Sequence, residues 1–263
     1  MKSIFKPILK YYLKLIAKLV LFIQRPKIIA VAGSVNKTFA RDEIQKVLEK
    51  AGPVKSTGAD HGASKKVRAN QRNFNTEIGL PLAILGISSG YNSYRQWWPI
   101  IGEAFWAIWQ KNFPACLVLE LGVSCAGDMK YLLSIIKPEI SVVTDITQRY
   151  LESFSTMNDL VAEYIVLAEK TKKSGAVILN ADNSRARELA KKSNAPVYYF
   201  GETCEGKKDW QITKIEKTET GQNVKIKHQE KTEEFSIPRF GAHHAFALAA
   251  SLAVEEVIKK QNE

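Results

Sequence analysis

The chain has 263 residues, 45% of them hydrophobic and 25% charged, a composition that is typical of a folded globular protein and excludes an intrinsically disordered chain. Its formal net charge of +11 comes mostly from the first 27 residues, which hold seven Lys or Arg and no Asp or Glu. The rest of the chain carries only +4, which argues against a nucleic-acid-binding protein whose basic face spreads through the folded domain. The three cysteines, Cys116, Cys125 and Cys204, form no CxxC pair, and we interpret them as reduced thiols of a cytoplasmic protein.

Residues 1–26 are predicted to form a basic amphipathic helix that precedes the main domain. Lysines recur at every fourth position from Lys2 to Lys18 and gather on one broad face, because a step of four residues drifts only about 40° around a helix. Pro7 indicates either a kink or the start of this helix. The apolar run Tyr11–Ile23 is about 20 Å long, too short to cross a hydrocarbon core of about 30 Å. Two alternatives stay open: peripheral contact with the anionic inner face of the cytoplasmic membrane, or packing of the apolar face against protein.

Residues 27–263 are predicted to form one α/β domain of the P-loop type, with a mostly parallel sheet flanked by helices. Short apolar runs suited to strands buried on both faces lie at Lys27–Ala32, Leu117–Leu121, Ile140–Ile146, Ala176–Ala181 and Val197–Phe200. Helical periods lie at Phe39–Ala51, Glu77–Leu85, Tyr94–Lys111, Gly127–Ile136, Met157–Lys173, Ser184–Ser193 and His244–Lys260. Residues 210–237 alternate with period two around a turn at 220–223, which predicts a small antiparallel flap.

The predicted helix Tyr94–Lys111 and the residues after it are unusually rich in large aromatic side chains, namely Trp97, Trp98, Phe105, Trp106 and Trp109. Such side chains suit a membrane interface, where the ring is apolar and the indole N–H stays hydrated. The alternative is a helix that covers the sheet and fills the core with its aromatic rings. The membrane interpretation gains weight if this helix and the N-terminal helix share a face.

The turn after the first predicted strand has the residues of a phosphate-binding loop and leads into a helix. It reads Gly33, Ser34, Val35, Asn36, Lys37 and Thr38. In a P-loop, backbone N–H groups and a helix N-terminus hold phosphate, the lysine contacts the outer phosphates and the threonine hydroxyl binds magnesium. The motif's glycine before the lysine is missing here, so the turn alone is a weak match, and a turn that serves only packing remains an alternative.

Segments along the whole domain resemble the central domain of the Mur ligase family, closest to its D-alanyl-D-alanine-adding branch. In chain order they are AVAGSVNKT (30–38), NFNTEIGLPL (73–82), LVLELGVSCAGDMKYL (117–132), KPEISVVTDITQRYLESF (137–154), GAVILNADN (175–183) and GAHHAFALAASLAV (241–254). The resemblance extends over residues 27–260 and its motifs keep the family's order and spacing. It implies an ATP-dependent amide ligase of peptidoglycan precursor synthesis, in which ATP phosphorylates a substrate carboxylate and an amine attacks the acyl phosphate.

The resemblance also implies which residues carry this chemistry, with ATP and Mg²⁺ as cofactors. Lys37 and Glu120 would be catalytic, and Thr38 and Glu120 would hold the metal. The nucleotide would be bound by Gly33, Ser34, Val35, Asn36, Lys37, Thr38, Asn180, Asp182 and His243, with Asn73 and Asn75 on the substrate side. For Glu120 the alternative is a strand-end carboxylate in a salt bridge, and for His243 a helix-start residue that faces water. The implied partner is a cell-wall precursor or a Mur-pathway protein, and no nucleic acid.

Several positions depart from the pattern of the family. Asn36 replaces the loop glycine, Tyr150 the metal-binding histidine and Tyr164 the carbamoylated lysine. Phe39 stands where a small hydroxyl residue is usual, and His244 and Ala247 replace asparagines. Glu163 and Glu169 are either substitute metal ligands or part of a solvated face. These departures imply that second-metal chemistry is lost, and they leave open a non-catalytic homologue that binds nucleotide or a partner at the membrane. The family's nucleotide-sugar-binding and closing domains are not expected within these 263 residues.

Overall fold

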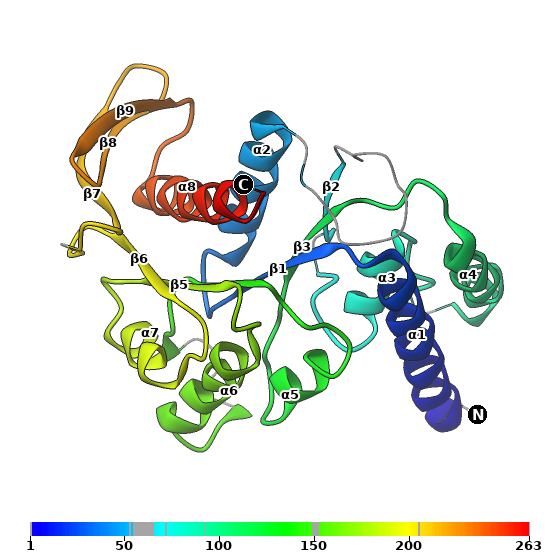
Figure 1. Cartoon of the computed structure of the whole chain (residues 1–263). Coiled ribbons are helices and arrows are strands. Elements are labelled where there is room, and N and C mark those ends of the chain that lie inside the picture. Colours follow the sequence, from blue (N-terminus) through cyan, green and yellow to red (C-terminus); the bar gives the residue numbers. More distant parts are fainter. Residues whose placement is uncertain are drawn as a thin grey trace.

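The computed structural model describes residues 2–52, 54, 66–71, 73–91, 93–148, 153–204 and 206–262. In these parts of the chain one sheet of nine strands runs in the order β2-β3-β1-β4-β5-β6-β7-β8-β9 (Figure 1). The strands are β1 (Lys27–Ala32), β2 (Val67–Ala69), β3 (Cys116–Glu120), β4 (Ile140–Val143), β5 (Ala176–Asn180), β6 (Val197–Gly201), β7 (Trp210–Lys217), β8 (Gln222–His228) and β9 (Lys231–Ile237). Pairing is parallel from β2 to β7 and antiparallel among β7, β8 and β9, which confirms the predicted fold class.

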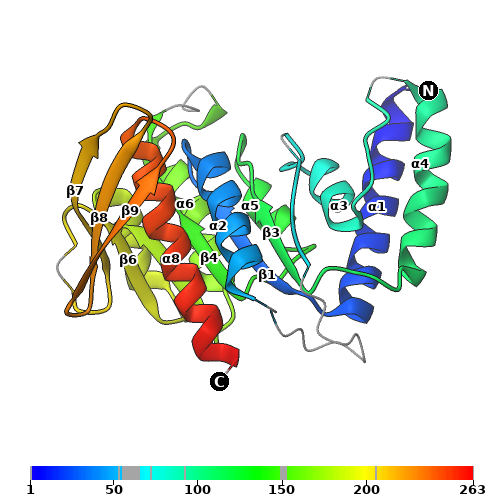
Figure 2. The same cartoon turned by 90° about the horizontal axis from the view of Figure 1, so that it is seen from above.

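Helices cover both faces of the sheet (Figures 1 and 2). On one face lie α2 (Lys37–Ala51) and α8 (Ala242–Asn262); on the other lie α5 (Asp128–Leu132), α6 (Met157–Lys170) and α7 (Ser184–Glu188), with the 3₁₀ turn η3 (Leu189–Lys192). Alternate residues of β1 explain the two layers: Ile29 and Val31 pack with α2 and α8, whereas Ile28 and Ala30 pack into the opposite core. At the β2 end stand α1 (Lys2–Gln24), α3 (Gly79–Leu85), α4 (Tyr94–Trp106) and the 3₁₀ turn η1 (Ala107–Trp109).

The antiparallel flap spans the predicted residues 210–237 and consists of three strands. Besides the predicted turn at 220–223, the chain turns a second time after His228, where Gln229 has a positive φ of 56°, and β9 follows. The flap also continues the main sheet, because β7 pairs with β6 in parallel at Phe200 and Gly201. The strand β2 was not predicted at all, since three residues are too few for a recognisable alternation.

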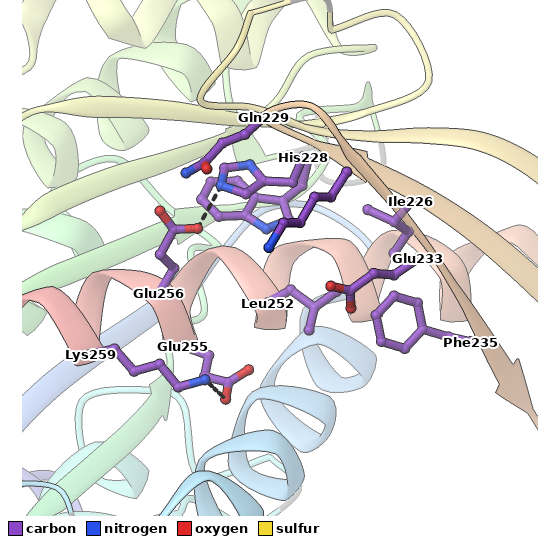
Figure 3. A pocket seen from close by; sticks show the side chains of 11 residues that line it. Ile226, His228, Gln229, Glu233, Phe235, Leu252, Glu255, Glu256 and Lys259 are labelled. Atoms are coloured by element: carbon purple, nitrogen blue, oxygen red, sulfur yellow. Dashed lines mark ion pairs between the residues drawn. The ribbon is translucent and has the colours of Figure 1, made fainter.

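The flap is held to α8 by an aromatic and ionic contact at its base (Figure 3). The rings of Trp210 and His228 stack with centroids 4.0 Å apart, and His228 Nε2 lies 2.6 Å from a carboxylate oxygen of Glu256. Beside this contact is a cavity of about 310 Å³ between the flap and the second half of α8. No residue of the phosphate loop lines it, so this cavity is separate from the predicted nucleotide site.

The N-terminal helix α1 is packed into the main core along one face. Leu13, Ala17 and Val20 are fully buried in the same hydrophobic cluster as residues of α3 and α4, and the Tyr12 hydroxyl donates to the Ile101 carbonyl at 2.8 Å. Lys10 donates to Glu77 at 3.0 Å, and this hydrogen bond lowers the pKa of the Glu77 carboxyl. Pro7 lies inside the helix and is not its start.

The opposite face of α1 carries large exposed side chains, so packing against protein describes only the inner face, and membrane contact of the outer face stays a prediction. Leu15 lies about 200° around the helix from Leu13 and is 47% exposed. Within the described residues we find no helix with the length and apolar character to cross a bilayer.

A pair of leucine substitutions two residues apart measures how much α1 contributes to stability. Leu13→Ala is expected to lower the free energy of unfolding by about 2–5 kcal/mol, because it leaves a cavity in a fully buried site. Leu15→Ala, at an exposed position, is expected to change it by less than about 0.5 kcal/mol. Urea denaturation of the full chain followed by circular dichroism measures both. Equal effects of the two substitutions would mean that α1 does not belong to the core.

Candidate functional site

The predicted phosphate loop lies between the carboxyl end of β1 and the start of α2, where the segment after β4 anchors it. Ser34 N donates to the Asp145 carbonyl at 2.6 Å, and Ser34 Oγ accepts from Thr147 N at 3.0 Å. Thr144 Oγ1 donates to the Val35 carbonyl at 2.7 Å. Both the backbone N–H and the hydroxyl of Ser34 therefore hold the loop to the segment after β4, and a role of Ser34 in phosphate binding stays a prediction.

Gly33 is required by the geometry of this turn. Its φ is +139°, and a Cβ at this position would lie 2.1 Å from Thr144 Oγ1, closer than any side chain tolerates. Asn36 takes the left-handed conformation, with a φ of 64°, and its side chain donates to Asp145 Oδ2 at 3.2 Å without capping α2. The turn thus survives the loss of the family's glycine, since asparagine adopts this conformation more readily than most residues.

Lys37 and the start of α2 make the inside of the loop positive. The Lys37 ammonium group reaches back across the loop and donates to the Gly33 carbonyl at 2.8 Å. The first N–H groups of a helix have no partner within the helix, and here the Asn36 side chain does not cap them. An ammonium group and a helix N-terminus directed at one turn form an arrangement that binds phosphate.

Glu120, the last residue of β3, lies beside the end of the loop and is only 5% exposed. Its Oε2 accepts from Thr38 Oγ1 at 2.9 Å and lies 3.4 Å from Arg41 NH1. Its Oε1 accepts from Asn75 Nδ2 at 2.8 Å. The carboxylate therefore forms the salt bridge of the alternative interpretation and also lies within reach of Thr38, while its role as a metal ligand stays a prediction. A carboxylate and a hydroxyl oxygen at the mouth of a phosphate loop are a donor set that fits Mg²⁺.

Asp145 is a central residue of the site that sequence reasoning missed. Its two oxygens accept from Asn36 Nδ2 at 3.2 Å and from Asn180 Nδ2 at 2.9 Å, so it joins the loop to the end of β5. Burial raises the pKa of this carboxyl, while the two amide hydrogen bonds oppose the shift. The signal was available, because Asp145 closely follows the apolar strand β4 as Glu120 ends β3, and a half-buried acid after such a run needs partners.

The two nucleotide-side residues after β5 differ in their surroundings. Asn180 is buried and directed at Asp145, next to the loop. The Asp182 carboxylate instead accepts from the backbone N–H groups of Glu202 and Thr203 at 2.8 and 2.7 Å. It therefore holds the turn after β6, and a role in nucleotide binding stays a prediction.

His243 lies against an aromatic side chain of α2 and does not simply face water. Its ring centroid is 4.4 Å from that of Phe39 and 4.2 Å from that of His244. Burial lowers the pKa of His244, and the neighbouring His243 adds to the shift. Three rings, tilted by 45° to 78° to one another, thus form a small aromatic cluster where α8 begins, and two of them, Phe39 and His244, are departures from the family pattern.

The substrate-side loop is fastened to Glu120 through asparagines. Asn75 contacts the carboxylate itself, whereas Asn73 is exposed and takes a positive φ of 66°. Asn70, which sequence reasoning missed, accepts from Glu120 N at 2.8 Å and donates to the Phe74 carbonyl at 3.0 Å. Beside this loop lies a cavity of about 340 Å³, whose lining includes Thr76, Gly122 and Ser124.

The positions of the expected second metal offer no ligand set in the part of the chain that the structure describes. Tyr150 lies outside the described residues. Tyr164 is 1% exposed and belongs to the core, so a lysine introduced there would bury its charge. The interpretation of Glu163 as a metal ligand or part of a solvated face was wrong: its carboxylate is buried and accepts from Gly127 N at 2.7 Å and Met129 N at 2.8 Å, which caps α5. Glu169 is exposed.

Two glycine substitutions separate backbone strain from steric overlap in the loop. Gly33→Ala is expected to destabilise the protein by about 2–4 kcal/mol, because the new Cβ meets Thr144 in addition to the strained φ. Gly127 also has a positive φ, +91°, but a Cβ there would meet nothing within 4 Å, so Gly127→Ala is expected to cost about 1–2 kcal/mol. Thermal and urea unfolding measure both, and a Gly33→Ala effect no larger than the control would show that the loop is not confined by Thr144.

Comparison with known proteins identifies relatives that are longer than this chain. The ligases named UDP-N-acetylmuramoyl-tripeptide--D-alanyl-D-alanine ligase from Haemophilus influenzae and Bacillus subtilis are each 24% identical to it, over 228 and 234 residues. Both alignments cover 86% of this chain but only 42% and 40% of the relatives. The chain therefore spans less than half the length of these curated relatives.

A solved structure and a family model agree with this likeness. The crystal structure of the MurF ligase from Thermotoga maritima in complex with ADP has the same fold, with a TM-score of 0.73 at 19% identity, covering 97% of this chain and 50% of that one. The model of the Mur ligase middle domain matches residues 105–255. Because this match covers more than half of the chain, the protein belongs to the Mur ligase family, through the middle domain of that family.

Proposed function

We propose that this chain is the ATP-binding part of an ATP-dependent amide ligase that joins an amino acid or peptide to a peptidoglycan precursor through an acyl phosphate. The observation that carries the proposal is the pair formed by the Thr38 hydroxyl and the Glu120 carboxylate, 2.9 Å apart at the end of a loop that also directs Lys37 inward. The names of the two curated relatives support the substrate class.

Each part of the loop has a task in this proposal. The ammonium group of Lys37 exchanges the Gly33 carbonyl for the outer phosphates, and the N-terminus of α2 holds the remaining phosphate charge. Thr38 and Glu120 hold Mg²⁺, and Asn75 keeps the carboxylate in place. Bound ATP supplies the phosphoryl group that activates a substrate carboxylate. The protein's contribution is then positioning and charge neutralisation, which is how most phosphoryl-transfer enzymes work.

In this proposal the base of ATP lies against the aromatic cluster of Phe39, His243 and His244, whose rings suit a planar base. Asn180 lies on the other side of the loop, where it contacts Asp145. On the substrate side, the cavity beside Asn75 has room for the reacting end of a precursor. We place this work in the cytoplasm, at the inner face of the membrane, on the basis of the basic helix α1.

A matched pair of substitutions tests the metal site. Thr38→Val keeps the shape of the side chain but removes the hydroxyl oxygen, and it is expected to weaken binding of ADP in the presence of Mg²⁺ about tenfold or more. Thr38→Ser keeps the oxygen and is expected to bind within about threefold of the parent protein. Isothermal titration calorimetry with and without EDTA measures the affinities. If EDTA leaves the difference between the two variants unchanged, the hydroxyl does not act through the metal.

Turnover tests the ligase against the non-catalytic alternative. The full chain with ATP, Mg²⁺, UDP-N-acetylmuramoyl-tripeptide and D-alanyl-D-alanine is expected to release ADP, and Glu120→Gln is expected to slow this release about a hundredfold. The control is Glu169→Gln, at an exposed carboxylate. A protein that is stabilised by nucleotide but releases no ADP with any precursor would be a binding homologue and not an enzyme.

A further inference from the structure

We propose that the protein docks on an anionic lipid surface through one outward face built from α1 and α4. We call this the helix-pair face and define it by Ile8, Tyr11, Leu15, Leu19 and Phe22 of α1 together with Trp98, Phe105, Trp106 and Trp109 of α4 and η1. The inference deepens the proposed location of the protein and does not depend on whether the phosphate loop turns over ATP.

The two helices lie side by side at the end of the molecule opposite the flap (Figures 1 and 2). Each has an inner stripe packed in the core, such as Leu13 and Val20 of α1 or Ile100 and Ala104 of α4. The helix-pair face consists of the exposed stripes of the same two helices. It is therefore an exposed apolar surface on two helices whose inner sides are already packed in the core.

The aromatic residues of this face are unusually large and open to solvent. Trp98 is 71% exposed, Trp106 70% and Phe22 71%. Phe105, Trp106 and Trp109 touch one another, with ring centroids 5.1–6.1 Å apart. Tryptophan suits the boundary between lipid and water, because its ring is apolar while its N–H remains hydrated.

A basic cavity adjoins the face at the C-terminal end of α1. It has a volume of about 350 Å³, and its lining includes Lys18, Arg25, Lys137 and Lys172 but no acidic residue, although Lys172 is paired with Glu139 at 2.6 Å. Phe22, which belongs to the helix-pair face, lines the same cavity. Cationic groups beside exposed apolar rings match a lipid whose headgroup carries a phosphate and whose chains lie next to it.

The charge of the helices selects a lipid surface over a second copy of this chain. Residues 2–25 contain no Asp or Glu, and Glu103 is the single acidic residue of residues 94–111. Lys6 and Lys10 are paired with Glu77, but Lys18 and Arg25 lie beside Phe22 of the face. Two copies that met through this face would bring these like charges together, whereas an anionic bilayer is complementary to them. The 23 residues of α1 form about 35 Å of helix, which gives the surface length along the bilayer plane.

Vesicle binding by the full chain tests the docking surface. With vesicles of equal parts phosphatidylglycerol and phosphatidylcholine, we expect binding in a flotation assay that is lost with pure phosphatidylcholine and weakened by salt. Trp106→Ser with Trp109→Ser is expected to reduce the partition coefficient at least tenfold. The control Phe240→Ser removes a ring that is 51% exposed near the flap, and it is expected to leave binding unchanged.

Two double substitutions, one at the basic cavity and one far from it, test whether basic side chains bind the lipid headgroups. Lys18→Gln with Arg25→Gln is expected to reduce binding about 25-fold, since each charge near an anionic surface contributes about fivefold. Lys191→Gln with Lys192→Gln removes the same charge from exposed positions of η3 and is expected to have less than a twofold effect. Equal losses for the two pairs would mean that only net charge matters and would overturn the assigned surface.

Two further outcomes would overturn the docking proposal. One is equal binding to neutral and anionic vesicles. The other is a dimer in light scattering that the two serine substitutions dissociate, which would mean that the face serves self-association. Calorimetry with ADP separates this result from the proposed function: the serine variant is expected to bind ADP as the parent does, and Thr38→Val to bind vesicles as the parent does. Unfolding midpoints of all variants verify that the exposed substitutions leave the fold intact.

Discussion

The buried carboxylate of Glu120 is the constraint around which the site is organised. An acid that ends an apolar strand and is 5% exposed must find partners, because an uncompensated buried charge costs several kcal/mol. It finds them on two segments, with Thr38 and Arg41 at the start of α2 and Asn75 on the substrate-side loop, while Asn70 after β2 accepts from the Glu120 backbone N–H. The predicted phosphate loop, the strand end and the substrate-side loop are thereby held around one point.

Asp145 performs a similar task on the other side of the loop. It fixes Asn36 and Asn180, and Asn36 is the residue that replaces the family's glycine. The replacement therefore adds a hydrogen bond while it keeps the left-handed backbone that a glycine provides. By contrast, the expected second-metal position at Tyr164 has become part of the core. The two departures thus have different effects: Asn36 preserves the shape of the site, whereas Tyr164 fills a place where the family has a charged group.

Much of this arrangement could be predicted from the sequence, because it follows from local patterns. The strand Lys27–Ala32 has its predicted bounds. The resemblance to the family implied that Thr38 and Glu120 lie together, and the two side chains are in contact at 2.9 Å. What could not be predicted depends on tertiary contacts. The sequence leaves the burial of Glu163 open, because only the placement of α5 supplies the two N–H groups that its carboxylate accepts. Similarly, the periodicity of α1 shows an apolar face but not that the helix has two.

The contact between Lys10 and Glu77 has a mechanical consequence. Glu77 follows Asn75 by two residues, and Asn75 holds the carboxylate of Glu120. The N-terminal helix therefore supports the substrate-side loop through this ion pair, while its outer surface stays exposed. A displacement of this helix would reach the carboxylate of Glu120, the proposed metal ligand, through two polar contacts and a single short stretch of backbone.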